Sequence, residues 1–137
     1  MRNTIEIVDV GGRFTGLAKN ASREFRRALA GAVAKGTERL ADEMFDLSPP
    51  RSDDPPHVKD AIDYTSRGLS GKAGILNGAE SAGSGDTTMG EVALFNEYDP
   101  NDQPFMRPAA DNVANDFAND CTQALERAVR ALEVTGL

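Results

Sequence analysis

The sequence contains little of the chemistry that enzymes and metal sites use. Its 137 residues include one cysteine, one histidine and no tryptophan. A lone cysteine excludes a disulfide within the chain, and a zinc site or a Ser-His-Asp triad needs histidine with defined partners. The single histidine, His57, stands beside prolines, which is typical of a surface or turn residue. The paired acidic residues have no second catalytic group beside them, so they are typical of solvated charges. We therefore expect a protein that is not an enzyme, with no catalytic residue, no metal site and no cofactor.

Long apolar runs are absent as well. No apolar stretch approaches the roughly 18 residues that span a bilayer, and the N-terminal residues lack the apolar region of a signal peptide. We therefore expect no membrane partner and a reducing cytoplasmic environment. Basic residues are in the minority, 15 against 22 acidic ones, which gives a formal net charge of −7. This balance disfavours tight binding of nucleic acid, although DNA can slide past an acidic surface.

Two segments begin like ion- or phosphate-binding loops, and both depart from the pattern. Residues 99–102 (DPND) resemble the start of a calcium loop. However, Pro104 stands where that loop needs glycine, and Ala110 where it needs a bidentate glutamate. Gly71-Lys72 resembles the end of a phosphate-binding loop, but Ala73 follows where serine or threonine is required. We interpret the first segment as a structural turn and reject the second as a phosphate site.

Two stretches have the periodicity of long amphipathic helices. Apolar residues recur at steps of three or four through residues 17–47, and a second stripe runs from about residue 108 to 134. Cys121 lies on the second stripe, which is typical of a small buried apolar residue. Gly31 and Gly36 each cost the first helix about 1 kcal/mol relative to alanine. Their small size predicts the close approach of another backbone.

Acidic residues are concentrated near the C-terminal end of the first helix. The helix dipole disfavours negative charge at this end. Two interpretations remain open: the acidic face contacts solvent, or a basic partner nearby offsets the charge. The residues concerned are Glu38, Asp42, Glu43 and Asp46.

Short strands are predicted at residues 4–10, 62–66, 72–76 and 89–95, from β-branched or apolar runs bounded by turn residues. A Gly- and Ser-rich stretch at about residues 77–86 predicts a flexible loop. The predicted fold class is α+β: a small, mostly antiparallel sheet of three to five strands packed by two long helices, about 17–47 and 108–134. The whole chain, residues 1–137, is predicted to form a single domain.

A rigid elbow precedes the second helix. Pro104 and Pro108 fix φ and bias the preceding residue toward an extended backbone, so Phe105 and Met106 point in a defined direction. Pro108 also suits the first position of the helix. The apolar pair points either into the core of its own subunit or at a neighbouring subunit. Under the second hypothesis the interface residues are Phe95, Glu97, Tyr98, Gln103, Phe105, Met106 and Arg107.

This region resembles the tail-completion or neck protein family of long-tailed bacteriophages. The resemblance rests on an aromatic-Asn-Glu-aromatic turn, a short polar loop and a Pro-Phe-Met-Arg-Pro-Ala sequence that opens the last helix. Weaker similarities of layout cover nearly the whole chain. Two pairs depart from the family, because Asp99-Pro100 and Ser52-Asp53 stand where Gly-Thr and Thr-Gly are usual. The matching residues are Ala93, Phe95, Glu97, Tyr98, Pro104, Phe105, Arg107, Pro108 and Ala109.

The resemblance implies a structural virion protein. Its subunits would form a ring, with a hexamer favoured, that completes or terminates the tail and joins it to the head-closure complex. The implied partners are other neck proteins and the tail-tube protein, and DNA would pass through the lumen without sequence-specific binding. The implied location is the virion neck, reached from the host cytoplasm during assembly. The alternative is a small cytoplasmic α+β module that dimerises and regulates, which predicts a two-fold dimer.

Overall fold

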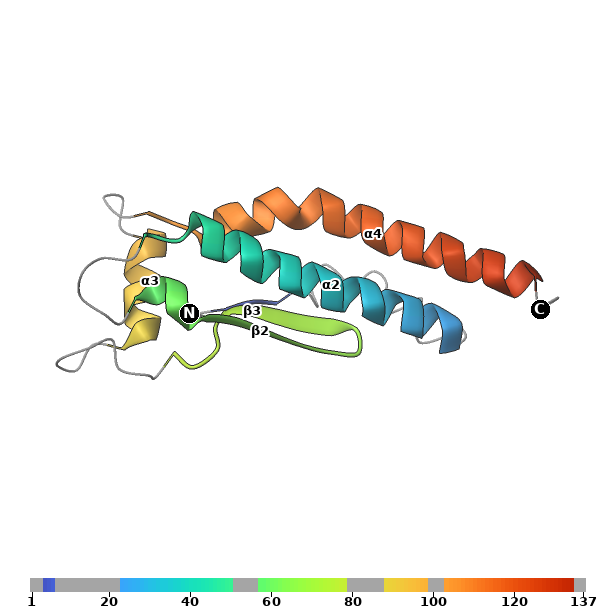
Figure 1. The fold of residues 1–137 in the computed structure, drawn as a ribbon, viewed down its shortest axis with the longest axis horizontal. Coiled ribbons are helices and arrows are strands. Elements are labelled where there is room, and N and C mark those ends of the chain that lie inside the picture. The colour runs from blue at the N-terminus through green and yellow to red at the C-terminus, as the bar shows by residue number, and fades with distance from the viewer. Residues whose placement is uncertain (1–3, 7–22, 51–56, 79–87, 99–102, 135–137) are drawn as a thin grey trace.

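The computed structural model describes residues 4–6, 23–50, 57–78, 88–98 and 103–134, which form two long helices, a shorter helix and a small sheet (Figure 1). The α+β class predicted from the sequence is confirmed. In chain order the elements are β1 (Thr4–Glu6), α2 (Arg23–Leu47), the 3₁₀ helix η1 (Val58–Ala61), β2 (Ile62–Arg67), β3 (Ser70–Ile75), α3 (Met89–Tyr98) and α4 (Met106–Val134).

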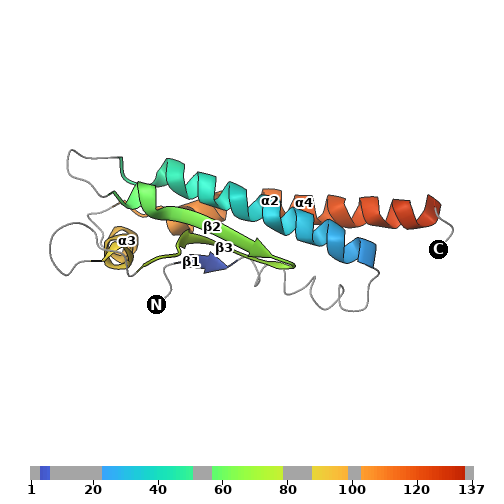
Figure 2. The same cartoon turned by 60° about the horizontal axis from the view of Figure 1, so that its bottom comes forward.

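The two long helices run side by side on the same side of the sheet (Figure 2). α2 contacts both α4 and the strands β2 and β3, so it is the central element of the fold. Its predicted end at residue 47 is confirmed, and residues 17–22 of the predicted helix lie outside the described part. α4 begins at Met106, two residues before the predicted start. Pro108 therefore occupies the first turn rather than the first position, which is tolerated because N–H groups there have no partner within the helix.

The core lies where the apolar stripes of α2 and α4 meet. Phe117 of α4 packs against Gly36 of α2, where an added Cβ would lie 2.4 Å from the Phe117 Cδ2 atom. The prediction that a backbone approaches closely is therefore not confirmed at Gly36, where the close neighbour is the Phe117 ring. The prediction is wrong at Gly31, which has no atom within 4 Å of an added Cβ. The buried residues of this contact include Leu29, Val33, Leu40, Met44, Val113, Phe117, Cys121 and Ala124.

The described sheet has the order β1-β3-β2, and both pairings are antiparallel. Arg67 pairs with Ser70, which leaves a two-residue loop between β2 and β3. Gly68 is the first residue of that loop and has φ of +57°, the region that a type II′ hairpin turn needs at this position. β2 and β3 confirm the strands predicted at 62–66 and 72–76. β1 matches the start of the strand predicted at 4–10, of which residues 7–10 lie outside the described part.

The backbone of β3 approaches α2 closely through a glycine. An added Cβ at Gly71 would lie 1.9 Å from the Thr37 Oγ1 atom, so only glycine fits beneath this turn of the helix. The Thr37 hydroxyl is fully buried and donates a hydrogen bond to the Val33 carbonyl at 2.7 Å. Most of β3 is buried, whereas β2 is almost entirely exposed. α2 contacts both strands, and β3 is more buried because it lies between β1 and β2 in the sheet.

The strand predicted at residues 89–95 is wrong, because Met89–Tyr98 form the helix α3. Thr88 precedes it, and its hydroxyl accepts a hydrogen bond from the Glu91 N–H at 3.3 Å, as an N-cap residue does. Met89 and Ala93 are buried one helical turn apart, so the short apolar run places one face on the core as a helix. Asn77 and Gly78 form a turn, and the remainder of the predicted loop at 77–86 lies outside the described residues.

Candidate interaction surface

The start of α4 is capped by a carboxylate from the end of α3. Glu97 Oε1 accepts hydrogen bonds from the backbone N–H groups of Phe105 at 2.6 Å and Met106 at 2.5 Å, and Oε2 accepts one from Arg107 at 3.3 Å. The first N–H groups of a helix have no partner within it, and the helix dipole favours negative charge there. Glu97 therefore satisfies three donors at once and holds α3 against α4.

An exposed pair lies beside this cap. The Arg107 Nη2 atom donates a hydrogen bond to the Tyr98 hydroxyl at 3.0 Å, and its guanidinium lies 4.7 Å from the centre of the Tyr98 ring. Tyr98 is 47% exposed. The contact combines a hydrogen bond with a cation–π interaction, so the two side chains are held together at the surface.

The end of α2 is held by three polar side chains. The Lys59 Nζ atom donates to the Phe45 carbonyl at 2.5 Å and lies 4.0 Å from the centre of the Phe45 ring. The Ser48 hydroxyl donates to the same carbonyl at 2.7 Å, and the Gln103 side chain donates to the Leu47 carbonyl at 2.6 Å. These carbonyls have no partner within the helix. Lys59 thus places a positive charge at the C-terminal end of α2. Glu38, Asp42 and Asp46 are exposed, which agrees with the interpretation that the acidic face contacts solvent.

The elbow directs its apolar pair into the core of its own subunit. Phe105 is fully buried and Met106 is 5% exposed. Of the two targets left open by the sequence, burial confirms the subunit's own core. Neither side chain offers apolar surface to a neighbour while the subunit keeps this conformation.

The remaining residues of the predicted interface have different positions. Tyr98, Gln103 and Arg107 are exposed and lie together at the elbow. Glu97 is half-buried, and its carboxylate binds the backbone N–H groups at the start of α4. The side chain of Phe95 lies outside the described part. The interface hypothesis therefore narrows to Tyr98, Gln103 and Arg107, for which it stays a prediction.

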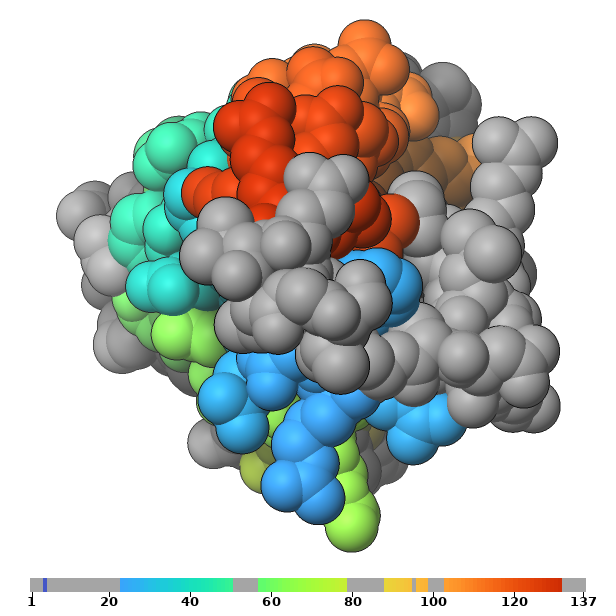
Figure 3. Space-filling view, turned by 90° about the vertical axis from the view of Figure 1, so that its right-hand side faces the viewer, coloured from blue at the N-terminus to red at the C-terminus, as the bar shows by residue number. Residues whose placement is uncertain are grey.

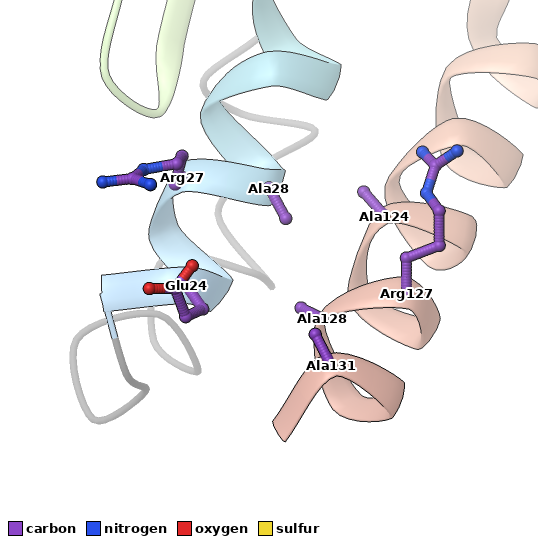
Figure 4. Close-up of a pocket in the computed structure, with 7 residues that line it drawn as sticks. All are labelled: Glu24, Arg27, Ala28, Ala124, Arg127, Ala128 and Ala131. Atoms are coloured by element: carbon purple, nitrogen blue, oxygen red, sulfur yellow. The ribbon is translucent and has the colours of Figure 1, made fainter. Parts of the chain in front are cut away.

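The opposite end of the α2–α4 pair contains a hollow that the sequence reasoning missed. Small side chains from both helices face each other across it (Figure 4). Charged residues also line it: Arg127 extends beside α4, whereas the Arg27 side chain extends from α2 on the side away from α4. Figure 3 shows this end of the molecule, with the last turns of α4 above the first turns of α2. Two adjoining spaces of about 280 and 270 Å³ make up the hollow. We call it the alanine groove, with Ala28, Ala124, Ala128 and Ala131 as its floor and Arg27, Lys35 and Arg127 as its flanks.

The residues considered for chemistry have ordinary structural positions. Cys121 is buried, and burial together with the neighbouring charge of Asp120 raises the pKa of its thiol. His57 is half-buried and precedes η1. Lys72 lies within β3, and residues 99–102 are outside the described part. Among the described residues, no three His, Cys, Asp or Glu side chains are placed to hold a metal ion.

No helix in the described ranges combines the length and the apolar character that crossing a membrane requires. Comparisons of the chain with family models, with curated proteins and with solved structures found no match. The two ends of the α2–α4 pair are therefore the features from which a function can be inferred. One end is held by polar side chains around the elbow, and the other carries the alanine groove.

Proposed function

We propose that this protein is a structural component of the neck or tail of a long-tailed bacteriophage. In this proposal its subunits form a ring, with a hexamer favoured, that completes or terminates the tail and joins it to the head-closure complex. The partners are other neck proteins and the tail-tube protein, and DNA passes through the lumen. The protein is not an enzyme in this role and takes no cofactor.

The observation that carries the proposal is that residues of the phage-like motif contact one another. Glu97 binds the backbone at Phe105 and Arg107, and Tyr98 binds the Arg107 side chain. These residues come from two segments on either side of residues 99–102. Because the residues of this motif contact one another, they form one structural unit. This supports the resemblance to the phage neck family that the motif suggests.

The exposed part of the elbow has a composition that suits an interface. Aromatic residues and arginine are enriched at protein–protein contacts, and Tyr98 and Arg107 are already paired there in one orientation. A neighbouring subunit that covers this pair meets a preorganised surface. We also retain the prediction that the sheet has three to five strands. In the described sheet β1 is an edge strand, and a neighbouring subunit can add a strand to such an edge.

A first test compares Arg107→Ala with Arg67→Ala in the phage that encodes the protein. Arg67 is an exposed arginine on β2, away from the elbow. We expect the Arg107 variant to accumulate separate heads and tails while the Arg67 variant assembles normally. Urea unfolding of both purified proteins checks that neither substitution acts through stability. Infectious particles at the wild-type level with Arg107→Ala would show that the elbow is not an assembly contact.

A second test concerns the assembly state. Negative-stain images and native mass measured across a concentration series distinguish a closed ring from a two-fold dimer. A ring of six subunits or a small multiple supports the neck proposal. A strict dimer supports the regulatory module instead.

A further inference from the structure

Charge is distributed unevenly along α2. Residues 23–35 carry four basic side chains and one acidic one, whereas residues 38–46 carry four acidic side chains and one basic one. The last turn of α2 contains no basic residue, although the helix dipole favours positive charge there. The helix dipole of α2 therefore does not account for this polarity, and Lys59, the basic side chain at that end, contacts the carbonyl and the ring of Phe45.

The acidic half presents a continuous stripe on the outer face of α2. Its members are separated by four, three and one positions, which places them on one side of a helix. All four are exposed, and Phe45 is 38% exposed between the carboxylates. Within the described ranges, the three carboxylates make no hydrogen bond or ion pair. We call Glu38, Asp42, Phe45 and Asp46 the acidic stripe.

The basic half of α2 forms one wall of the alanine groove. Arg27 and Lys35 from α2 and Arg127 from α4 flank the groove, and Glu24 also lines it. In the part of the chain that the structure describes, these three basic side chains make no ion pair. Asp120 also lines the groove, and its carboxylate forms a salt bridge with Arg39 at 3.2 Å.

Most of the groove and most of the stripe are too far apart to pair within one subunit, and the exception is Lys35, which lies three residues from Glu38 on α2. Arg27 and Asp42 are fifteen residues apart on one helix, which corresponds to about 22 Å along its axis. At that separation in water the attraction between single charges is largely screened by salt. Apart from Lys35 and Glu38, the complementary charges of the groove and the stripe can be brought together only between two molecules.

We infer that the acidic stripe of one copy docks in the alanine groove of the next copy. The exposed part of Phe45, whose ring centre also lies 4.0 Å from the Lys59 Nζ atom, contacts the small side chains of the floor, and the neighbouring carboxylates meet the basic side chains of the groove. Arg127 sets this contact apart from a pairing of two α2 helices alone, because it comes from α4.

An open series of such contacts leaves one free stripe at one end and one free groove at the other. Interfaces between two different surfaces of the same protein form a ring when the rotation closes and a filament when it does not. The inference therefore rests on the proposed ring and assigns its subunit contact. It places the elbow end of each subunit against the groove end of its neighbour.

The experiment uses charge reversal at each surface with a matched control. Arg127→Glu changes the groove, with Arg67→Glu as the control for net charge. Asp42→Arg changes the stripe, with Glu91→Arg as its control, because Glu91 is exposed on α3. Sedimentation at about 50 mM salt should show association weakened about tenfold or more by each surface variant and unchanged by each control, since like charges at an interface repel.

Mixing the two surface variants provides the sharpest test. In the mixture the reversed stripe of one protein meets the reversed groove of the other, and the two unchanged surfaces also meet. We expect the mixture to regain most of the wild-type association, as species larger than a dimer. If the mixture forms only a heterodimer, the two proteins pair around a two-fold axis. This result would overturn the head-to-tail arrangement.

Other outcomes separate this inference from the proposed function. A wild-type protein that stays monomeric, or a ring that neither reversal weakens, overturns the stripe-to-groove contact. If antibodies still locate the protein at the neck of virions, the neck proposal stands without it. If Arg127→Glu weakens binding of DNA or of another virion protein but not self-association, the groove has a different occupant.

Discussion

The two ends of the α2–α4 pair are held together by different means. At the elbow end, Glu97, Lys59 and Gln103 bind the helix backbones from separate parts of the chain, and Phe105 fills the core beneath them. At the other end, alanines face each other across a hollow, and the flanking side chains are basic. The first arrangement fixes the subunit, whereas the second leaves space between the helices.

The difference indicates that the elbow end of the helix pair stabilises the subunit, whereas the groove end offers a surface for binding. Large buried side chains and satisfied helix ends supply most of the stability at the elbow end. The small side chains of the groove floor bury little apolar surface, so substitutions of exposed residues beside them should have a small effect on folding. A surface of this kind can be used for assembly at little cost to the subunit's own stability.

The largest effect expected is from Phe105→Ala. Removing a fully buried phenylalanine typically lowers the free energy of unfolding by about 3–5 kcal/mol. The matched control is Val129→Ala near the groove end, where the side chain is 43% exposed, and the expected change there is within about 0.5 kcal/mol. Urea unfolding at a concentration that keeps the protein monomeric measures both. Equal losses for the two variants would contradict the proposed difference between the ends.

Substitution of the capping carboxylate should have the next largest effect. Glu97→Ala leaves three N–H groups at the start of α4 without their acceptor, so we expect a loss of about 2 kcal/mol. Glu97→Gln keeps one acceptor oxygen and should cost less. Hydrogen exchange at residues 105–107 should quicken in the alanine variant. Unchanged exchange would indicate that Glu97 does not cap the helix in solution.

The two helical glycines of α2 offer a comparison within one element. Gly36→Ala places a Cβ against the buried ring of Phe117. It should lower the free energy of unfolding by about 1 kcal/mol, because overpacking of about 1–3 kcal/mol exceeds the gain in helix propensity. Gly31→Ala enters open space near the groove and should raise it by about 0.5–1 kcal/mol. Thermal unfolding of both variants checks the opposite signs, and the same sign for both would contradict the packing.

The smallest effect concerns Cys121. Burial, and then the charge of Asp120, raises the pKa of its thiol in the folded protein above the unfolded value of about 8.5. The folded state therefore disfavours the thiolate, and this contribution to stability is present below pH of about 8.5 and is lost as the pH rises further. The stability difference between the wild type and Cys121→Ala should shrink between pH 8 and 10 (about the range of the titration). A pH-independent difference would contradict the raised pKa.

Helix and strand positions with strong periodicity could be predicted from the sequence. The apolar stripes of α2 and α4 repeat over many turns, and β2 and β3 lie on either side of a glycine turn. α3 could not be predicted, because the short apolar run within residues 89–95 fits a strand or a helix equally well. Burial of Met89 and Ala93 one turn apart decided between them.

The contacts of the candidate surfaces were harder to predict. Pro104 and Pro108 revealed a stiff elbow, but nothing local to Phe105 shows whether it points inward or outward. The cap depends on Glu97 reaching residues eight to ten positions away. The alanine groove forms between residues about 100 positions apart, such as Ala28 and Ala128, and alanine gives no distinctive signal in a stripe of apolar residues.

The pairing of α2 with α4 also has a consequence for synthesis. The groove and the core need side chains from both helices, and the ion pair of Arg39 with Asp120 spans 81 residues. β1 likewise pairs Thr4 with Gly74. Contacts between distant residues form slowly, and α2 leaves the ribosome with its apolar stripe uncovered until residues 106–134 follow. A ribosome-bound chain can therefore present the acidic stripe early, but it can offer no groove to receive one before α4 has been made.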